Sequence, residues 1–410
     1  MKLVDNTVQP HTVHVVQQRF TVSYDYPIFF SRDVFAPSNL LLNETLCRDG
    51  TSTIKRFVVV IDHGLSQKRP LLSREIDVYA SAHKKTIELA EKPLVLPGGE
   101  RIKNNQAYIK HVLDLLHRNR IDRHAYLVVI GGGAMLDMAG LAAALFHRGV
   151  RLVRLPSTVL AQNDAGVGVK NGINAFGCKN LIGTFSPPYA VINDNKLLDT
   201  LPKRDRIAGL AEAVKVALVR DESFFKWLEH NALALASFEQ NSTCEMIQRC
   251  AKLHLQHIAE NGDPFEMGSA RPLDFGHWLA HRLESLTKNE VRHGEAVAIG
   301  MCVDNRYSVK QNWLSEHDEQ RVAQLLETLG LPTSHPLLNT PSGREVLWQG
   351  VESFREHLGG TLSISMLTAP GHCYEIHEIN FADMMTVMGQ IGERFNEQNG
   401  ETACASSNNI

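Results

Sequence analysis

Three histidines stand close together in the second half of the chain, at positions 277, 281 and 293. His277 and His281 are four residues apart, so on a helix that begins after Gly276 they share one face. A single histidine more often caps or packs a helix than binds a metal, but three in so short a span suggest a metal site. Glu212 is the best candidate for the remaining ligand, because two imidazoles and one carboxylate leave a coordination position open for substrate.

A run of three glycines in the first half offers a second kind of chemistry. Gly131-Gly132-Gly133 follows an apolar run and precedes a helical pattern, so its backbone could approach a pyrophosphate at a helix N-terminus. The spacing differs from the usual GxGxxG, and a purely structural turn is the alternative. Asp62, at the end of another apolar run, is a candidate for binding ribose hydroxyls, and Glu100 and Lys103 offer a polar pair at the same sheet edge.

Residues 156–183 are rich in glycine, with lysines and asparagines spaced among apolar residues. This composition predicts a loop folded around an anionic ligand, and the alternative is a glycine-rich connection with incidental lysines.

Two patterns describe the elements that must position these residues. Strands are expected at 56–62, 94–96, 125–130 and 152–156. Helices are expected at 104–117 and from the glycine turn to about residue 146. Strands that alternate with helices indicate a mostly parallel sheet covered on both faces. One or two edge strands are also expected near the N-terminus, at Thr12–Val16 and Phe20–Tyr24.

After about residue 198 the β-branched runs give way to long helical patterns, at 207–218, 244–259, 278–286, 295–309 and 319–329. A late strand pair is expected at 362–367 and 373–376, and a last helix at 381–395. The predicted domains are an α/β nucleotide-binding domain over 1–199, a mainly α-helical domain over 200–395, and a disordered tail over 396–410.

Composition excludes several classes of protein. A chain of 410 residues is too long for one ordinary core, and a net charge of −3 gives no basic footprint for nucleic acid. The sequence has neither a membrane-length apolar run nor a signal-peptide layout. Its seven cysteines are scattered and never form a CxxC pair, which favours reduced thiols and a cytoplasmic location.

In their order along the chain, these motifs resemble the 3-dehydroquinate synthase superfamily, the sugar phosphate cyclases. The resemblance covers Val58 to Val309 and is carried by Gly131-Gly132-Gly133 with Asp137, Asp164 with Lys170, Lys179-Asn180, Glu212 with Lys215, and Gly276-His277 with His281 and His293-Gly294-Glu295. It implies a Rossmann-like N-terminal domain, a helical C-terminal domain, a homodimer, bound NAD, and a divalent metal, zinc or cobalt. The implied reaction removes and returns one hydride, eliminates phosphate, and closes a carbocycle by an aldol addition.

The resemblance also implies roles for individual residues. The metal ligands would be Glu212, His277 and His293. Lys170, Asn180 and His281 would surround the substrate phosphate, Lys215 would bond the hydroxyl being oxidised, Asp164 would complete the catalytic set, and Arg148 would reach the neighbouring subunit's site. The cofactor-binding residues would be Asp62, Glu100, Lys103, Gly132, Gly133, Asp137, Ser157, Thr158 and Lys179.

The sequence departs from dehydroquinate synthases where those enzymes hold a substrate carboxylate. Gln256 and Ala270 stand where a lysine and an arginine are expected, and Asp274 replaces an asparagine. Losing the two cations would weaken carboxylate binding by roughly 1.5–3 kcal/mol for each charge-assisted bond. Arg271, one position away, could still reach a carboxylate.

The segments 262–266, 271–278 and 354–360 instead resemble the branch that cyclises sedoheptulose 7-phosphate, a sugar phosphate without a carboxylate, to 2-epi-5-epi-valiolone or 2-epi-valiolone. This is the expected function. The alternatives are a 3-dehydroquinate synthase, a metal-dependent alcohol dehydrogenase of similar build, and a catalytically silent nucleotide-binding protein.

Overall fold

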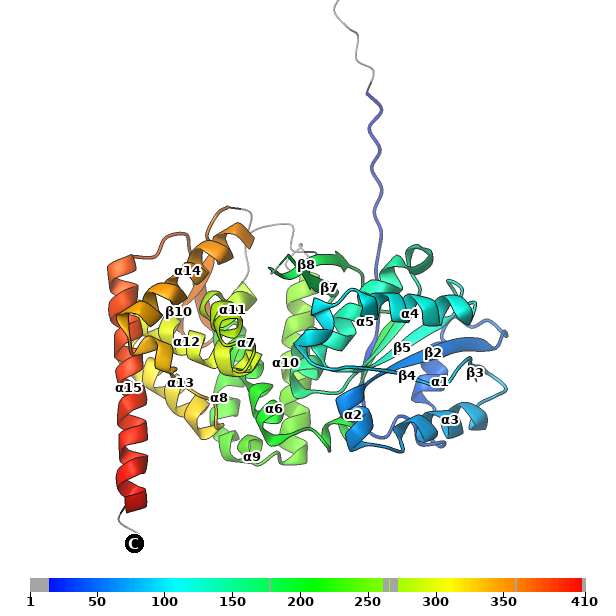
Figure 1. Ribbon diagram of the computed structural model, residues 1–410, viewed down its shortest axis with the longest axis horizontal. Helices are drawn as coiled ribbons and strands as arrows, with labels where there is room; N and C mark the ends of the chain where they lie inside the picture. The colour runs from blue at the N-terminus through cyan, green and yellow to red at the C-terminus, as the bar shows by residue number, and fades with distance from the viewer. Residues whose placement is uncertain (1–14, 177, 261–264, 266–271, 358–359, 408–410) are drawn as a thin grey trace, which may run out of the picture.

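The computed structural model describes residues 15–176, 178–260, 265, 272–357 and 360–407. The chain forms an α/β half followed by a helical half, and the two lie side by side (Figure 1). The predicted fold class is confirmed.

A parallel sheet forms the centre of the α/β half. Its strands are, in order across the sheet, β1 (Ile28–Ser31), β9 (Ala190–Asp194), β6 (Arg151–Pro156), β5 (Tyr126–Gly131), β2 (Lys55–Asp62) and β3 (Ile87–Leu89), with β4 (Leu94–Leu96) also paired to β2. Every pairing in this sheet is parallel. The four predicted strands are therefore β2, β4, β5 and β6. The strands β1, β3 and β9 were not predicted, and each has at most five residues.

Side chains of β2 alternate between two apolar cores, as the period of a strand requires. Phe57, Val59 and Ile61 pack into the core on one face, whereas Val58 and Val60 pack into the core on the other. The first core lies under α1 (Leu41–Leu46), α2 (His63–Lys68) and α3 (Leu72–Ala82), and the second under α4 (Ala107–Arg118) and α5 (Gly133–Leu145). Burial on both faces explains why β2 reads as one continuous apolar run.

A two-stranded antiparallel hairpin occupies the second half of the glycine-rich stretch that was predicted to be a loop. It consists of β7 (Lys170–Ala175) and β8 (Cys178–Phe185) and lies at the junction of the two halves (Figure 1). Gly172 pairs with Gly183, where a Cβ atom would come within 3.0 Å and 2.4 Å, respectively, of backbone oxygen atoms of the opposite strand. The loop prediction was wrong because these glycines serve a close approach of two strands.

The helical half is built around α7 and α12, whose residues are mostly buried. Its helices are α6 (Lys203–Ala208), α7 (Leu210–Arg220), α8 (Glu222–His230), α9 (Ala232–Ala236), α10 (Gln240–Glu260), α11 (His277–Leu286), α12 (His293–Lys310), α13 (Glu316–Thr328), α14 (Pro341–His357) and α15 (Phe381–Ser407). The predicted late strand pair is the hairpin β10 (Ile364–Ala369) and β11 (His372–Ile376). Shorter helical turns occur at Glu100–Asn104, Phe146–Arg148, Ala161–Ala165, Asn195–Leu198, Pro272–Asp274 and Pro336–Leu338.

Predictions at the two ends of the chain were wrong. The predicted strand Phe20–Tyr24 lies in an extended segment without strand pairing, where Phe20 is 84% exposed, and the edge strand is β1 instead. Positions 12–14 of the other predicted strand lie outside the described residues. The helix α15 continues as far as Ser407, through most of the predicted disordered tail.

No helix in the described part of the chain is both long and apolar enough to cross a membrane. Six cysteines are free thiols, namely Cys47, Cys178, Cys244, Cys250, Cys302 and Cys373.

Candidate active site at the domain junction

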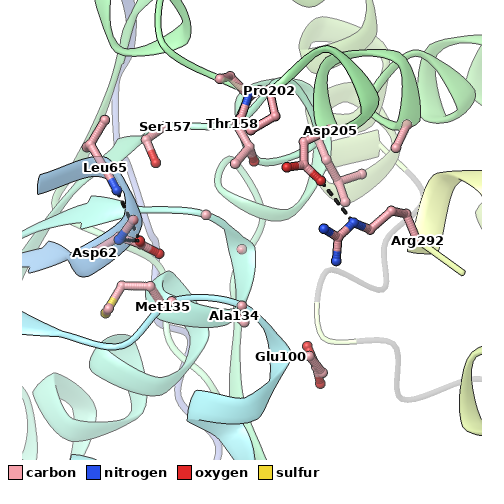
Figure 2. Close-up of a pocket in the computed structure, with 18 of the residues that line it drawn as sticks. Asp62, Leu65, Glu100, Ala134, Met135, Ser157, Thr158, Pro202, Asp205 and Arg292 are labelled. Carbon is pink, nitrogen blue, oxygen red and sulfur yellow. Dashed lines mark hydrogen bonds and ion pairs between the residues drawn. The ribbon is translucent and has the colours of Figure 1, made fainter. Parts of the chain in front are cut away.

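A cleft of about 540 Å³ lies between the α/β half and the helical half (Figure 2). The carboxyl ends of parallel strands meet along one of its walls, the edge at which open α/β sheets bind ligands. Six of the residues predicted to bind the cofactor line the cleft, namely Asp62, Glu100, Gly132, Gly133, Ser157 and Thr158. The opposite wall includes Asp205, Arg292 and His293 from the helical half.

The glycine turn after β5 presents backbone N–H groups to the cleft. Gly132 is the N-cap of α5 and forms no side-chain capping bond, so the first N–H groups of this helix are available to an anion. A Cβ atom at Gly132 would lie 3.2 Å from Thr158, and one at Gly133 would lie 3.1 Å from Ala165. These glycines therefore keep the turn tight against the neighbouring strand end.

Asp62 lies at the carboxyl end of β2, beside the glycine turn. Its Oδ1 accepts hydrogen bonds from the backbone N–H groups of Gly64 at 2.7 Å and Leu65 at 3.4 Å, and so caps α2. Both bonds use Oδ1, which leaves Oδ2 for a ligand. A Cβ atom at Gly98 would lie 2.0 Å from this Oδ2, so glycine is needed there. Burial raises the pKa of Asp62, although these N–H groups oppose the shift.

Lys103 and Asp137 bind each other and are not among the residues that line the cleft. Lys103 Nζ lies 2.8 Å from Asp137 Oδ2, 4.0 Å from Glu100 Oε1, and also contacts Asn180 Oδ1. Burial lowers the pKa of Lys103, but Asp137 and Glu100 outweigh it and raise the pKa overall. This charged network fixes Glu100 and the hairpin strand β8 beside the cleft.

Glu212, His277 and His293 come together from three helices. Glu212 lies on α7 with its side chain fully buried, while His277 and His293 are the first residues of α11 and α12. The Nε2 atoms of His293 and His277 lie 3.4 Å and 3.9 Å from Glu212 Oε1, and the ligand atoms of the three residues all lie within 4.8 Å of one another. Lys215 forms an ion pair with Glu212 Oε2, whereas Oε1 accepts no hydrogen bond from the described residues.

Hydrogen bonds fix the orientation of both imidazoles. His277 Nδ1 donates to the carbonyl oxygen of Phe275 at 3.0 Å, and His293 Nδ1 donates to Glu284 Oε2 at 3.2 Å. Because both partners can only accept, each Nδ1 carries a proton. The two Nε2 atoms are the ones that face Glu212. Glu284 was missed at the sequence level, although it stands three residues after His281, on the same helical face.

The charges in this cluster call for a cation. Burial alone would raise the pKa of Glu212, but Lys215, His293 and His277 hold it well below its usual range. Burial would lower the pKa of His293, yet Glu284 and Glu212 raise it to about 10. A carboxylate oxygen without a hydrogen bond, two aligned imidazoles and a demand for positive charge fit a divalent metal. The group His281, Glu284 and His293 is also compact, but Glu284 is already engaged by His293 and by Lys179.

His281 lies beside this cluster, with its ring centre 5.4 Å from that of His277. Burial, His277 and His293 lower the pKa of His281 to about 3, so the ring is neutral at pH 7. It can therefore offer a ligand a hydrogen bond but not a positive charge.

Asp274 lies close to this group of basic residues. Burial opposes ionisation of Asp274, but His277, Lys170, Lys215 and His281 together lower its pKa. Asp274 is thus a charged, half-buried carboxylate beside the predicted metal ligands.

Asp164 lies in the short π-helical turn after β6, the kind of irregularity often found at functional sites. Its Oδ1 lies 3.0 Å from Nδ1 of His254, a residue of α10 that the sequence did not single out. Asp164 also acts electrostatically on Lys215. Burial lowers the pKa of Lys215, but the negative charges of Glu212 and Asp164 outweigh this effect and raise the pKa overall. The structure therefore brings Asp164 to the side of the site where Lys215 lies.

Other predicted residues lie elsewhere. Arg148 is exposed in a turn after α5 and is not among the residues that line the cleft. Gln256 is half-buried on α10. Ala270 and Arg271, the positions compared with the arginine of dehydroquinate synthases, lie outside the described residues.

Comparison with known proteins relates both halves of the chain to the same family. Residues 93–208 match the 3-dehydroquinate synthase N-terminal model, and residues 209–349 match the 3-dehydroquinate synthase C-terminal model. A 3-dehydroquinate synthase of Halorhodospira halophila is 36% identical over 315 residues, which are 76% of this chain and 87% of that protein.

Two solved structures of cyclases are also similar. The 2-epi-5-epi-valiolone synthase from Streptomyces hygroscopicus subsp. jinggangensis 5008, with NAD+ and Zn2+ bound, has a TM-score of 0.81 and 27% identity, and the match covers 93% of this chain and 99% of that one. A 2-deoxy-scyllo-inosose synthase complexed with carbaglucose-6-phosphate, NAD+ and Co2+ has a TM-score of 0.72 at 22% identity, covering 88% and 96%, and shows similarity of fold.

Proposed function

The chain belongs to the 3-dehydroquinate synthase family, and from this premise we propose that it cyclises sedoheptulose 7-phosphate to a C7 cyclitol, 2-epi-5-epi-valiolone or 2-epi-valiolone, with loss of phosphate. It is an enzyme of the sugar phosphate cyclase superfamily, a lyase. The choice among substrates is the proposal.

The observation that carries this choice is the charge of Asp274. A half-buried carboxylate beside His277, Lys170 and Lys215 disfavours a second carboxylate on the substrate but accepts hydrogen bonds from hydroxyls. Gln256 offers no cation where dehydroquinate synthases have a lysine. Sedoheptulose 7-phosphate carries hydroxyls and no carboxylate, so it suits this charge distribution. The 27% identity with a 2-epi-5-epi-valiolone synthase supports the same substrate.

Two cofactors belong to the proposal. Glu212, His277 and His293 would hold a divalent metal, zinc or cobalt, since their ligand atoms lie within 4.8 Å of one another and Glu212 Oε1 accepts no hydrogen bond from the described residues. NAD would lie in the cleft on the glycine turn and Asp62, as in a dinucleotide-binding site. When bound, NAD supplies a reversible hydride transfer and the metal supplies a Lewis acid.

The protein's own groups would mainly position the substrate. The buried Lys215 keeps its proton, so it can donate to the hydroxyl that is oxidised. Lys170 supplies charge to the phosphate, and the neutral His281 supplies a hydrogen bond. Asn180 has its amide oxygen bound by Lys103, which leaves its NH2 group for the phosphate. In a homodimer, Arg148 of a second copy would complete the site.

The test is an incubation of purified protein with NAD and Zn2+ or Co2+, followed by phosphate release and NMR of the product. We expect phosphate and a cyclitol from sedoheptulose 7-phosphate, and none from the carboxylated seven-carbon keto-acid phosphate. Cyclisation of the carboxylated substrate alone would contradict the proposal. Net NADH formation would indicate an alcohol dehydrogenase. NAD binding without turnover of either substrate would indicate a catalytically silent nucleotide-binding protein.

The second candidate function is that of 3-dehydroquinate synthase itself. It is favoured by the 36% identity with the Halorhodospira halophila protein. Arg271, one position from the expected arginine, also favours it. The two-substrate assay distinguishes the candidates directly.

A further inference from the structure

Lys179 connects the hairpin of the α/β half to the helical half. Its Nζ lies 2.9 Å from Oε1 of Glu284 on α11, and the other oxygen of Glu284, Oε2, accepts from Nδ1 of His293 at 3.2 Å. The Glu284 side chain is 6% exposed and the Lys179 side chain 29% exposed. A single buried carboxylate therefore lies between the hairpin and a proposed metal ligand.

The next residue along the strand connects the hairpin to the opposite side. Asn180 contacts Lys103 through Oδ1, and its backbone N–H donates to Asn174 Oδ1 at 2.9 Å. Lys179 and Asn180 lie in the irregular part of the hairpin, where the pairing register shifts and Asn180 has a φ of 54°. Here β8 is held on one side by the bond from Lys179 to Glu284 and on the other by the bond from Lys103 to Asn180. Figure 1 shows this hairpin between α5 and the helical half.

Glu284 determines how His293 presents its second nitrogen. An acceptor at Nδ1 keeps the proton on that atom and leaves the Nε2 lone pair for a metal held with Glu212. Lys179 in turn orients the Glu284 carboxylate and offsets its buried charge. Displacing the hairpin would remove Lys179 and loosen this arrangement.

We propose that Lys179 and Glu284 are positioning residues that tie the β7–β8 hairpin to His293, so that the metal is held at full affinity only while the hairpin is docked on the helical half. This inference rests on the metal site of the proposed function. It predicts that a residue of the α/β half affects metal affinity without being a ligand.

The test measures zinc affinity of the metal-stripped full chain by competition with a chromophoric chelator. Removing a carboxylate that orients a metal-bound histidine typically weakens metal affinity about 10–100-fold, and we expect this for Glu284→Gln. Lys179→Met should weaken it in the same direction by less, and Lys179→Arg should restore it. The matched controls are Glu229→Gln and Arg321→Met, which break a 2.6 Å ion pair between α8 and α13. Both should leave zinc affinity unchanged.

Two further readouts separate positioning from general damage. The visible spectrum of the Co2+-loaded protein should change in Glu284→Gln, because it reports ligand geometry. The double variant should bind zinc no more weakly than Glu284→Gln alone, because Lys179 acts through Glu284. Wild-type zinc affinity and an unchanged Co2+ spectrum in Glu284→Gln would overturn the inference, as would effects that multiply in the double variant.

The outcome also distinguishes this inference from the function on which it rests. A wild-type protein that binds no zinc would remove the proposed metal site itself. Stoichiometric zinc binding that neither variant alters would overturn the positioning role alone. If Glu284→Gln fails to fold, Lys179→Met decides, because it removes a partly exposed side chain.

Discussion

Replacing Lys215 with methionine tests whether Glu212 is a buried charge that a metal can neutralise. The side chains of Glu212 and Lys215 are 0% and 4% exposed and form an ion pair. Methionine retains a long apolar side chain but removes the ammonium group. Breaking a buried pair by removing one partner costs about 3–5 kcal/mol, because the remaining charge is uncompensated. At about 2–4 °C for each kcal/mol, metal-free Lys215→Met protein should melt roughly 6–20 °C below wild type.

Zinc should reduce this deficit, because a cation beside Glu212 replaces the missing positive charge. The assay is thermal unfolding followed by circular dichroism, once in chelator and once with excess zinc. Lys226→Met is the control, since it breaks a pair with Glu222 whose side chains are 59% and 51% exposed and should have little effect. A metal-free cost no larger than that of the control, or a deficit that zinc leaves unchanged, would refute the reasoning.

Three further predictions concern pH, packing and specificity. Burial raises the pKa of Asp304 to about 7, so the protonated carboxyl is favoured in the folded protein. Its contribution to the stability of the fold is full below the unfolded pKa of 3.8 and is lost as the pH rises through 7. The urea midpoint of the wild type should therefore fall over this pH range, and that of Asp304→Asn should fall less. Gly300→Ala would place a Cβ atom 2.1 Å from a backbone oxygen and should lower the melting temperature, whereas Gly389→Ala, with 3.7 Å of space, should not. Gln256→Lys with Asp274→Asn should raise relative kcat/KM for the carboxylated substrate about tenfold or more in phosphate-release assays, and no change would show that neither position contacts that group.

The central sheet could be predicted because a strand buried on both faces has a continuous run of apolar residues. Residues of β2 are apolar at consecutive positions, since each face has its own core. The strands β7 and β8 have no such apolar run. The side chains of β8 are largely exposed, and its pairing depends on the contact between Gly172 and Gly183, which are eleven positions apart. That contact is tertiary, so the local composition resembled a loop.

The proposed site was predictable in its chemical types but not in its connections. Glu212, His277 and His293 could be grouped because few residue types bind a metal. The sequence assigned Lys179 to the cofactor, whereas the structure pairs it with Glu284 across the junction. No local pattern relates two residues 105 positions apart in sequence.

The position of the histidines explains why this cluster favours a metal over a structural ion pair. His277 and His293 begin α11 and α12, where helix dipoles oppose positive charge on a side chain. The nearby carboxylates of Glu212 and Glu284 demand positive charge at the same place. A cation held between the Nε2 atoms and Glu212 meets that demand while both imidazoles remain neutral donors of lone pairs. Metal binding should therefore stabilise the fold as well as the reaction, and chelation should lower the stability of the helical half.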